Sequence, residues 1–215
     1  AIKRSVRYKR MKEQKKSKEE IEKKFNTKTE MQVFSWKGKI DTLLSPRDSI
    51  LYSKYFLHSG LMSMEPSTGH VKAYVGGINY ENFQYDHVTS GKRQVGSTFK
   101  PFLYALAIQE GYSPCYQVPN VPVVFDKYKW GLEKDWTPNN SGDKDLEGLT
   151  LTLKYGLANS INTVTAYIMK QFGPHAVVDL AKKIGIKSKI LAVPSLCLGT
   201  FDLSVYEMVG AYSTF

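Results

Sequence analysis

Two short stretches of this chain hold residue types that together can perform acyl transfer. The first is Gly96-Ser97-Thr98-Phe99-Lys100, in which a hydroxyl and an amine are three positions apart. At the start of a helix, side chains at this spacing face the same side. A serine hydroxyl becomes an effective nucleophile when a base takes its proton. Lysine can be that base if its pKa is low enough for the amine to be neutral.

A helix start favours both a neutral Lys100 and a negatively charged intermediate. Burial lowers the pKa of an amine, and the positive end of a helix dipole disfavours a cation. The free N–H groups of the first turn also point at incoming negative charge, as an oxyanion requires. The alternative is that Ser97 only caps the helix and Lys100 lies on the surface. The preceding Gly96 and the apolar face behind the pair favour the chemical interpretation.

The second stretch is Ser160-Ile161-Asn162, which lies at a break between two apolar helical patterns. In an extended loop, Ser160 and Asn162 can point to the same side. The hydroxyl can relay protons, and the carboxamide can hold an amide substrate as donor and acceptor at once. Serine and asparagine are also favoured helix caps, so capping alone stays open as an alternative.

Apolar spacing predicts the helices that position these residues. A helix over residues 98–109 would end before Gly111 and hold Pro101 in its first turn, with Ser97 as its cap. The residues of its apolar face are Phe99, Phe102, Leu103, Leu106 and Ala107.

Further helices are predicted over residues 149–158, 164–172, 176–184 and 203–211. A β-hairpin is predicted over residues 60–77. Its strands, residues 61–64 and 71–75, flank the turn Glu65-Pro66-Ser67-Thr68-Gly69. Alternation in the second strand predicts that it is half-buried.

The positive charge belongs to one end of the chain. Of the 215 residues, the first 40 hold 14 Lys or Arg against 5 Glu, whereas the remainder holds 16 basic and 15 acidic residues. The sparse apolar positions of residues 1–30 predict an exposed helix, with Ile21 and Phe25 one turn apart. A solvated helix or linker explains this run, and an anionic membrane surface can attract it. No aromatic or Gly-rich RNA motif accompanies the run, so we expect no nucleic-acid partner.

The remaining reactive residue types predict neither a metal site nor a cofactor. The histidines, at positions 58, 70, 87 and 175, lack metal-ligand spacing. Cys115 and Cys197 can form a disulfide in an oxidising compartment or remain two buried thiols, and the second interpretation is favoured.

Together, the two stretches and their surroundings resemble the transpeptidase domain of class A penicillin-binding proteins, whose motifs include Ser-x-x-Lys and Ser-x-Asn. The resemblance covers the chain from about residue 46 to its end. The segments that carry it are residues 64–71, 75–77, 93–102, 136–140 and 157–163.

This resemblance implies an α/β fold of the penicillin-binding and serine β-lactamase kind, with an antiparallel sheet flanked by helices. It implies that Ser97 is the acylated nucleophile and Lys100 its general base. Ser160 would carry protons towards the leaving group, and Asn162 would help Ser97 to hold the substrate. The partners would be D-Ala-D-Ala stem peptides of peptidoglycan, cross-linked by acyl transfer, and β-lactams, which acylate the same serine.

The resemblance also predicts the organisation of the chain. Residues 1–45 look like a basic helical connector between a glycosyltransferase and a transpeptidase, and residues 46–215 like the N-terminal portion of the transpeptidase domain. The setting would be the cell envelope, on the periplasmic or extracytoplasmic face of the plasma membrane, with anchoring by an upstream segment.

Two departures from the family pattern stand out. Val95 stands where proline is common, and residues 1–215 contain no Lys-Thr-Gly or Lys-Ser-Gly. In the family that third motif lies on a strand opposite the nucleophile. We therefore expect the C-terminal strands to be missing here and these residues alone to be weakly acylated or inactive.

Three other functions remain open on the sequence. A serine β-lactamase needs a carboxylate that positions the deacylating water, a non-catalytic β-lactam sensor or scaffold needs only the fold, and a basic-tail module would bind polyanions. The candidate carboxylates between the two motifs are Glu110, Asp126, Glu133, Asp135, Asp143, Asp145 and Glu147.

Overall fold

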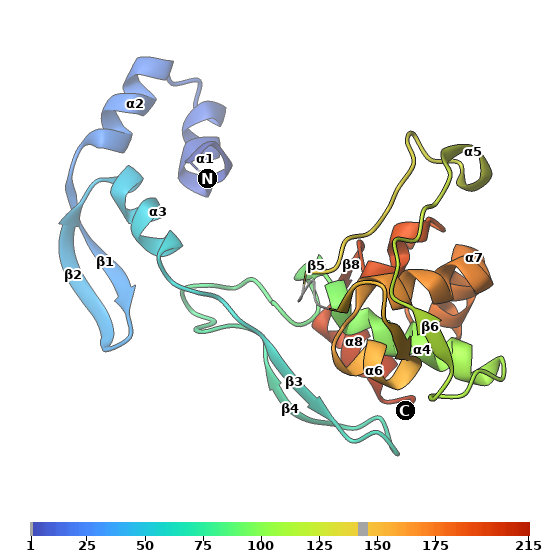
Figure 1. Ribbon diagram of the computed structural model, residues 1–215. Helices are drawn as coiled ribbons and strands as arrows, with labels where there is room; N and C mark the ends of the chain where they lie inside the picture. Colours follow the sequence, from blue (N-terminus) through green and yellow to red (C-terminus); the bar gives the residue numbers. More distant parts are fainter. Residues whose placement is uncertain (1, 142–145) are drawn as a thin grey trace. The chain divides into compact units, whose positions relative to one another are not determined.

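The computed structural model describes residues 2–141 and 146–215. They fall into two compact units, which Figure 1 shows in sequence colours. The first comprises residues 1–59 and 79–84, and the second comprises residues 60–78 and 85–215. Among the described residues, no helix has both the length and the apolar character needed to cross a bilayer.

The first unit joins a small helical part to a β-hairpin and a third helix. Ser17 begins the second helix with a reciprocal capping box to Glu20. Ile21 and Phe25 are buried against Met11 of the first helix, so the predicted exposed helix is a pair of helices with its own small core. The elements are η1 (Ile2–Arg4), α1 (Val6–Glu13), α2 (Lys18–Asn26), β1 (Thr29–Ser35), β2 (Gly38–Leu44) and α3 (Pro46–Lys54).

The boundary between the units differs from the one predicted near residue 45. Ser45 caps α3 as the Ser-Pro turn predicted, but α3 packs on β1 and β2, so it belongs to the first unit. Tyr52 of α3 donates a hydrogen bond to the carbonyl of Phe34 at 2.9 Å. Phe56 packs edge-on against Phe34. These contacts move the end of the unit to Ser59.

The second unit contains short antiparallel strand pairs and a helical core. Its strands pair as β3 with β4, β5 with β8 and β6 with β7. Together with the β1–β2 hairpin, these pairings confirm the α/β class with antiparallel strands. The elements are β3 (Leu61–Met64), β4 (Val71–Val75), β5 (Lys92–Gln94), η2 (Gly96–Phe99), α4 (Lys100–Gln109), β6 (Gln117–Pro119), α5 (Lys127–Trp130), β7 (Thr150–Thr152), α6 (Leu153–Ala158), α7 (Asn162–Lys183), η4 (Pro194–Leu198), β8 (Asp202–Ser204) and α8 (Val205–Tyr212).

The predicted hairpin over residues 60–77 is present, but its burial differs from the prediction. Both strands have the predicted bounds. Every residue of β4 is exposed, with Val71 and Val75 at 47% and 50% of their full exposure. The alternation of apolar and polar residues thus predicted the strand correctly, but neither face of β4 is buried.

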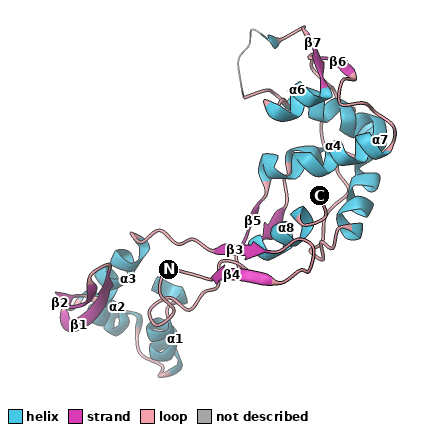
Figure 2. Cartoon of the chain, turned by 90° about the horizontal axis from the view of Figure 1, so that it is seen from below, coloured by secondary structure: helices cyan, strands magenta, loops and turns pink. Residues whose placement is uncertain are grey.

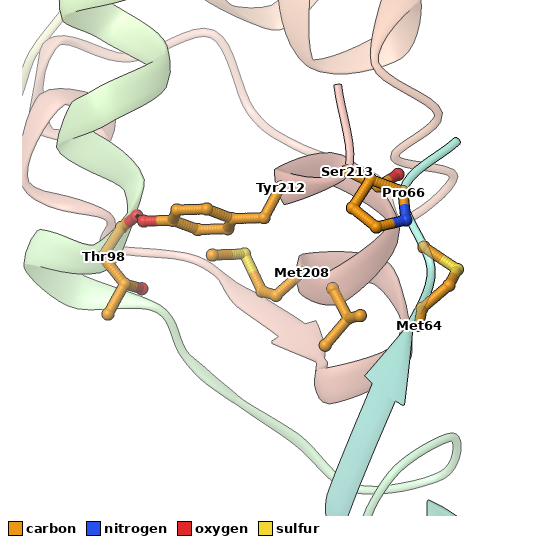
Figure 3. Close-up of a pocket in the computed structure, with 7 residues that line it drawn as sticks. Met64, Pro66, Thr98, Met208, Tyr212 and Ser213 are labelled. Carbon is orange, nitrogen blue, oxygen red and sulfur yellow. Dashed lines mark hydrogen bonds between the residues drawn. The ribbon is translucent and has the colours of Figure 1, made fainter. Parts of the chain in front are cut away.

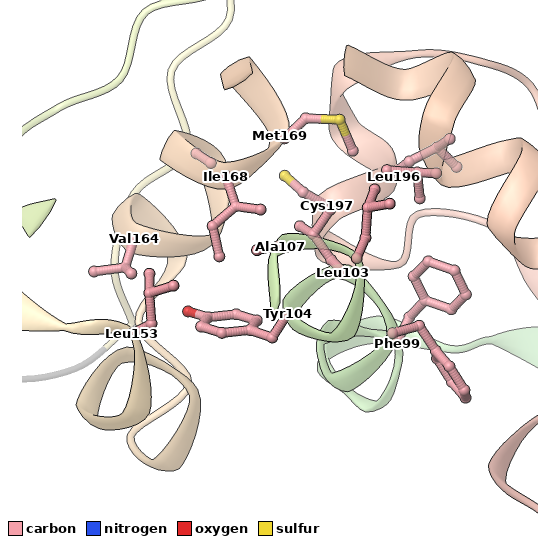
Figure 4. Close-up of a cluster of buried hydrophobic side chains, with 14 of the residues drawn as sticks. Phe99, Leu103, Tyr104, Ala107, Leu153, Val164, Ile168, Met169, Leu196 and Cys197 are labelled. Carbon is pink, nitrogen blue, oxygen red and sulfur yellow. The ribbon is translucent and has the colours of Figure 1, made fainter. Parts of the chain in front are cut away.

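Helices α4, α6 and α7 lie side by side around the main core (Figure 2). The apolar face predicted for α4 is buried, with Phe99 and Leu103 fully enclosed. Figure 4 shows Phe99 and Leu103 in one cluster with Val164 and Ile168 of α7 and Leu196 of η4.

Several predicted helices have different bounds. The pattern predicted as a helix over residues 149–158 is helical only from Leu153 to Ala158, because residues 150–152 form strand β7. The patterns over residues 164–172 and 176–184 form one long element, α7, broken at Gly173, where φ is 76° and Pro174 follows. The helix predicted from residue 203 begins later, at Val205, because residues 202–204 pair with β5. Ser204 then caps α8.

Candidate active site

The nucleophile segment is a tight turn braced by a second segment. Ser97 does not cap the helix as predicted. It lies inside the 3-10 helix η2, which leads directly into α4 and has no side-chain cap. The N–H of Gly96 donates to the carbonyl of Gly199 at 3.0 Å. A Cβ on Gly199 would collide with the backbone of Gly96, so this position accepts only glycine without movement.

Lys100 is buried and bonded directly to the second motif. Its side chain is 1% exposed, yet all three of its donors are used. Lys100 Nζ donates to the carbonyl of Ser160 at 2.7 Å, to Ser160 Oγ at 2.9 Å and to Asn162 Oδ1 at 2.6 Å. The alternative of a surface lysine beside a capping serine is therefore wrong.

The second motif forms a strained turn between α6 and α7. Ser160 has φ of 55°, which a non-glycine residue rarely adopts and which costs roughly 1–2 kcal/mol. Asn162 is the first residue of α7. The left-handed turn, rather than the expected extended loop, directs Ser160 and Asn162 to the same amine.

Burial lowers the pKa of Lys100 from 10.5 to about 8. A coulombic interaction with Cys197 opposes this shift. With a pKa of about 8, about one tenth of the amines are neutral at pH 7. Burial thus provides the neutral fraction of amine that a general base requires.

The hydroxyl of Ser97 is available for reaction. The residue is exposed and sits in the first turn of a helix, where backbone N–H groups have no intrahelical partner. A neutral amine can take a proton from a hydroxyl that reaches it. Ser160 can then reverse its hydrogen bond and donate to the amine, because a hydroxyl is both donor and acceptor. The structure therefore brings Lys100, Ser160 and Asn162 into direct contact and places Ser97 one helical turn away in sequence.

The sequence analysis assigned no role to the residues that support the second motif, although Asn140 lies in segment 136–140, which carries part of the resemblance. Asn140 Oδ1 accepts from the N–H groups of Asn162 at 2.9 Å and Thr163 at 3.1 Å. Asn120 is 2% exposed and accepts from Asn140 Nδ2 at 3.0 Å. These residues are about twenty or more positions apart in sequence, so no local pattern indicates that they meet.

The two cysteines remain separate thiols. Both cysteines are free thiols, which excludes the disulfide. The prediction of two buried thiols is correct for Cys197 and wrong for Cys115, which is exposed. Burial raises the pKa of the Cys197 thiol to about 12.

An apolar pocket of about 410 Å³ adjoins the nucleophile segment. Figure 3 shows Tyr212 of α8 pointing at Thr98, whose carbonyl accepts its hydroxyl at 2.6 Å. Met64 and Met208 form much of the apolar lining. Lys100, Ser160 and Asn162 do not line this pocket, so it is not the cleft of the polar cluster.

Two of the carboxylates considered for a β-lactamase bind backbone N–H groups in the loop around α5. Asp126 and Asp135 accept backbone N–H groups of Lys129 and Lys127 in α5. Asp143 and Asp145 lie outside the described residues. The hydrogen bonds of Lys100 go to Ser160 and Asn162, not to a carboxylate.

Comparison with known proteins gives a family match in each of the two units. Residues 1–57 match the family described as penicillin-binding protein middle domain, and residues 60–193 match the penicillin binding protein transpeptidase domain. The first match overlaps the predicted connector, whose role stays a prediction.

Individual relatives agree with this family. Penicillin-binding protein 1A of Pseudomonas aeruginosa is 33% identical over 159 residues, which are 73% of this chain and 19% of that protein. Penicillin-binding protein 2D of Bacillus subtilis is 35% identical over 155 residues, which are 72% of this chain and 22% of that protein. The crystal structure of penicillin-binding protein 1A from Haemophilus influenzae aligns with a TM-score of 0.67 and 29% identity, over 73% of this chain and 23% of that one.

The chain thus spans about a fifth of the length of these relatives. The transpeptidase match covers more than half of the chain and contains Ser97, Lys100, Ser160 and Asn162. The chain therefore belongs to the family of penicillin-binding protein transpeptidase domains.

Proposed function

We propose that the protein is a serine D,D-transpeptidase that cross-links peptidoglycan stem peptides and is acylated by β-lactams. The observation that carries the proposal is the buried amine of Lys100, bonded to both Ser160 and Asn162. Family membership supports the reaction class. The roles of the individual residues rest on the resemblance, and the contacts of Lys100 support them.

In the acylation step, Ser97 Oγ attacks the carbonyl carbon of the penultimate D-Ala of a stem peptide. Neutral Lys100 takes the hydroxyl proton, and the positive first turn of η2 favours the oxyanion. The C–N bond to the terminal D-Ala then breaks. The proton passes from Lys100 through Ser160 to the leaving amine, and free D-Ala departs. Asn162 Oδ1 is bonded to Lys100 and one hydrogen of Nδ2 to Asn139, so the second hydrogen of Nδ2 donates to the substrate amide.

In the second step, an amine of a neighbouring strand attacks the ester carbon. A new amide bond forms, Ser97 Oγ leaves and recovers a proton from the attacking amine through Lys100. The same cluster thus serves both half-reactions. With a β-lactam, the ring amide takes the place of the D-Ala-D-Ala bond and the ester remains on Ser97.

The setting of the protein is also a proposal. The relatives are penicillin-binding proteins, which supports penicillin binding by this protein. An extracytoplasmic position, membrane anchoring through another segment and an attached glycosyltransferase rest on the resemblance to bifunctional members of the family.

The direct test uses the protein in its full natural length with a donor peptide ending in D-Ala-D-Ala and an acceptor amine. We expect D-Ala release and a cross-linked product, and neither from Ser97→Ala. D-Ala release that persists in this variant contradicts the proposal. Rapid turnover of a β-lactam would identify a β-lactamase instead, and acylation without D-Ala release would identify a sensor.

A further inference from the structure

The N-terminus of α7 is held by a side chain from a distant loop. Ile161, which precedes the helix, provides no side-chain cap. The cap comes from Asn140, whose Oδ1 accepts the first two N–H groups, those of Asn162 and Thr163. The neighbouring carbonyl of Asn139 accepts Asn162 Nδ2 at 2.7 Å.

The orientation of the Asn140 carboxamide is itself fixed by Asn120. Asn120 Nδ2 donates to the carbonyl of Leu146 at 2.6 Å, which turns Asn120 Oδ1 towards Asn140. The hydroxyl of Thr163 donates to the same oxygen. An acceptor at this point requires the NH₂ of Asn140, so the oxygen of Asn140 must face α7. The network is enclosed, since Asn120 and Thr163 are 2% and 5% exposed.

We propose that Asn140, oriented by Asn120, is a positioning residue that holds the Ser160–Asn162 turn for proton transfer at Lys100. This inference rests on the proposed function. The turn contains the left-handed Ser160 and receives all three hydrogen bonds of Lys100. Contacts outside the turn must offset the cost of that conformation.

Asn139 and Asn140 together bind the backbone and the side chain of Asn162. Asn140 holds its backbone N–H and the carbonyl of Asn139 holds its side-chain NH₂, which leaves Oδ1 for Lys100. Without Asn140 the first turn of α7 loses its cap, and Asn162 and Ser160 can move relative to the amine. Misplacement of about 1 Å can cost about 100-fold in rate.

The chain offers a matched pair of substitutions for the test. Asn140→Ala removes the cap. Asn139→Ala removes an exposed neighbouring side chain and keeps the backbone carbonyl. Asn140→Asp keeps an acceptor for the two N–H groups but cannot donate to Asn120, and its negative charge suits a helix N-terminus.

The experiment uses the full-length natural protein and two readouts. One is the second-order rate constant of acylation by benzylpenicillin. The other is hydrogen–deuterium exchange of a peptide that contains residues 160–166. We expect Asn140→Ala to acylate about 10- to 100-fold more slowly and to exchange about tenfold faster in this peptide. Asn140→Asp should have an acylation rate and an exchange rate between those of Asn140→Ala and the wild type. Asn139→Ala should have the wild-type values of both.

The outcomes separate the inference from the proposed function. Wild-type acylation and exchange in Asn140→Ala would overturn the inference, as would faster exchange with an unchanged acylation rate. Equal losses in Asn140→Ala and Asn140→Asp, with general loss of protection across the second unit, would also overturn it by showing a purely structural role. A wild-type protein that benzylpenicillin does not acylate contradicts the proposed function, and with it the catalytic role assigned to Asn140, while the exchange experiment still reports whether the cap exists.

Discussion

Lys100 combines complete burial with three hydrogen bonds to the second motif. Burial opposes its charge and lowers its pKa to about 8, whereas the three acceptors keep the amine in place. Residue types and spacing singled out Ser97, Lys100, Ser160 and Asn162, and the structure brings the last three into contact. The sequence could not predict Asn120 and Asn140, because their contact with α7 depends on how loops distant in sequence fold together.

The pKa of Lys100 predicts the pH dependence of acylation. Only the neutral amine accepts the proton of Ser97, so the rate should rise about tenfold per pH unit below about 8 and level off above it. The thiol of Cys197, which interacts with Lys100, has a pKa of about 12 and stays protonated over this range. Stopped-flow acylation by a chromogenic β-lactam from pH 6 to 10 measures the profile. A flat profile would show that Lys100 is not the base.

Helices α4, α6 and α7 meet closely enough to require a glycine. A Cβ on Gly156 of α6 would lie 2.7 Å from Val164 Cγ1 and 3.0 Å from the hydroxyl of Tyr104. Apolar periodicity predicted these helices because packing needs such a face. It did not predict η2, because a 3-10 turn before α4 follows from the tertiary contact between Gly96 and Gly199. Nor did it predict the β1–β2 hairpin.

The close contact predicts a difference between two helical glycines. Gly156→Ala should destabilise the second unit by about 1–3 kcal/mol, because the added methyl group overpacks the contact of α6 with α4 and α7. Gly210→Ala in α8 is the control, since a Cβ there has nothing within 4 Å. Alanine at that position should be neutral or stabilising by up to about 1 kcal/mol. Chemical denaturation followed by tryptophan fluorescence measures both. Equal stability of the two variants would contradict the packing described.

At the scale of the whole molecule, the two units have separate cores. The first has a cluster of Met11, Ile21 and Phe25, and the second has the core around α4. The change in composition predicted two parts, but not their boundary. The boundary depends on the contact of α3 with the β1–β2 hairpin, and no local sequence pattern shows that contact.

Separate cores predict separate responses to mutation. Phe25→Ala should destabilise the first unit by about 3–5 kcal/mol and leave acylation at Ser97 unchanged. Leu57→Ala is the control, because Leu57 lies in the same unit and is 89% exposed. Hydrogen exchange of each unit, together with the acylation rate, measures the outcome. Loss of acylation in Phe25→Ala would show that the second unit depends on the first.

The central claim is that Ser97 is a nucleophile activated by Lys100. The most direct measurement is the intact mass of the full-length natural protein with and without benzylpenicillin, beside Ser97→Ala and Lys100→Met. One covalent adduct on the wild type, none on Ser97→Ala and a strongly slowed adduct on Lys100→Met is the result predicted. An adduct that survives in Ser97→Ala, or a wild-type protein that stays unmodified, would contradict the claim.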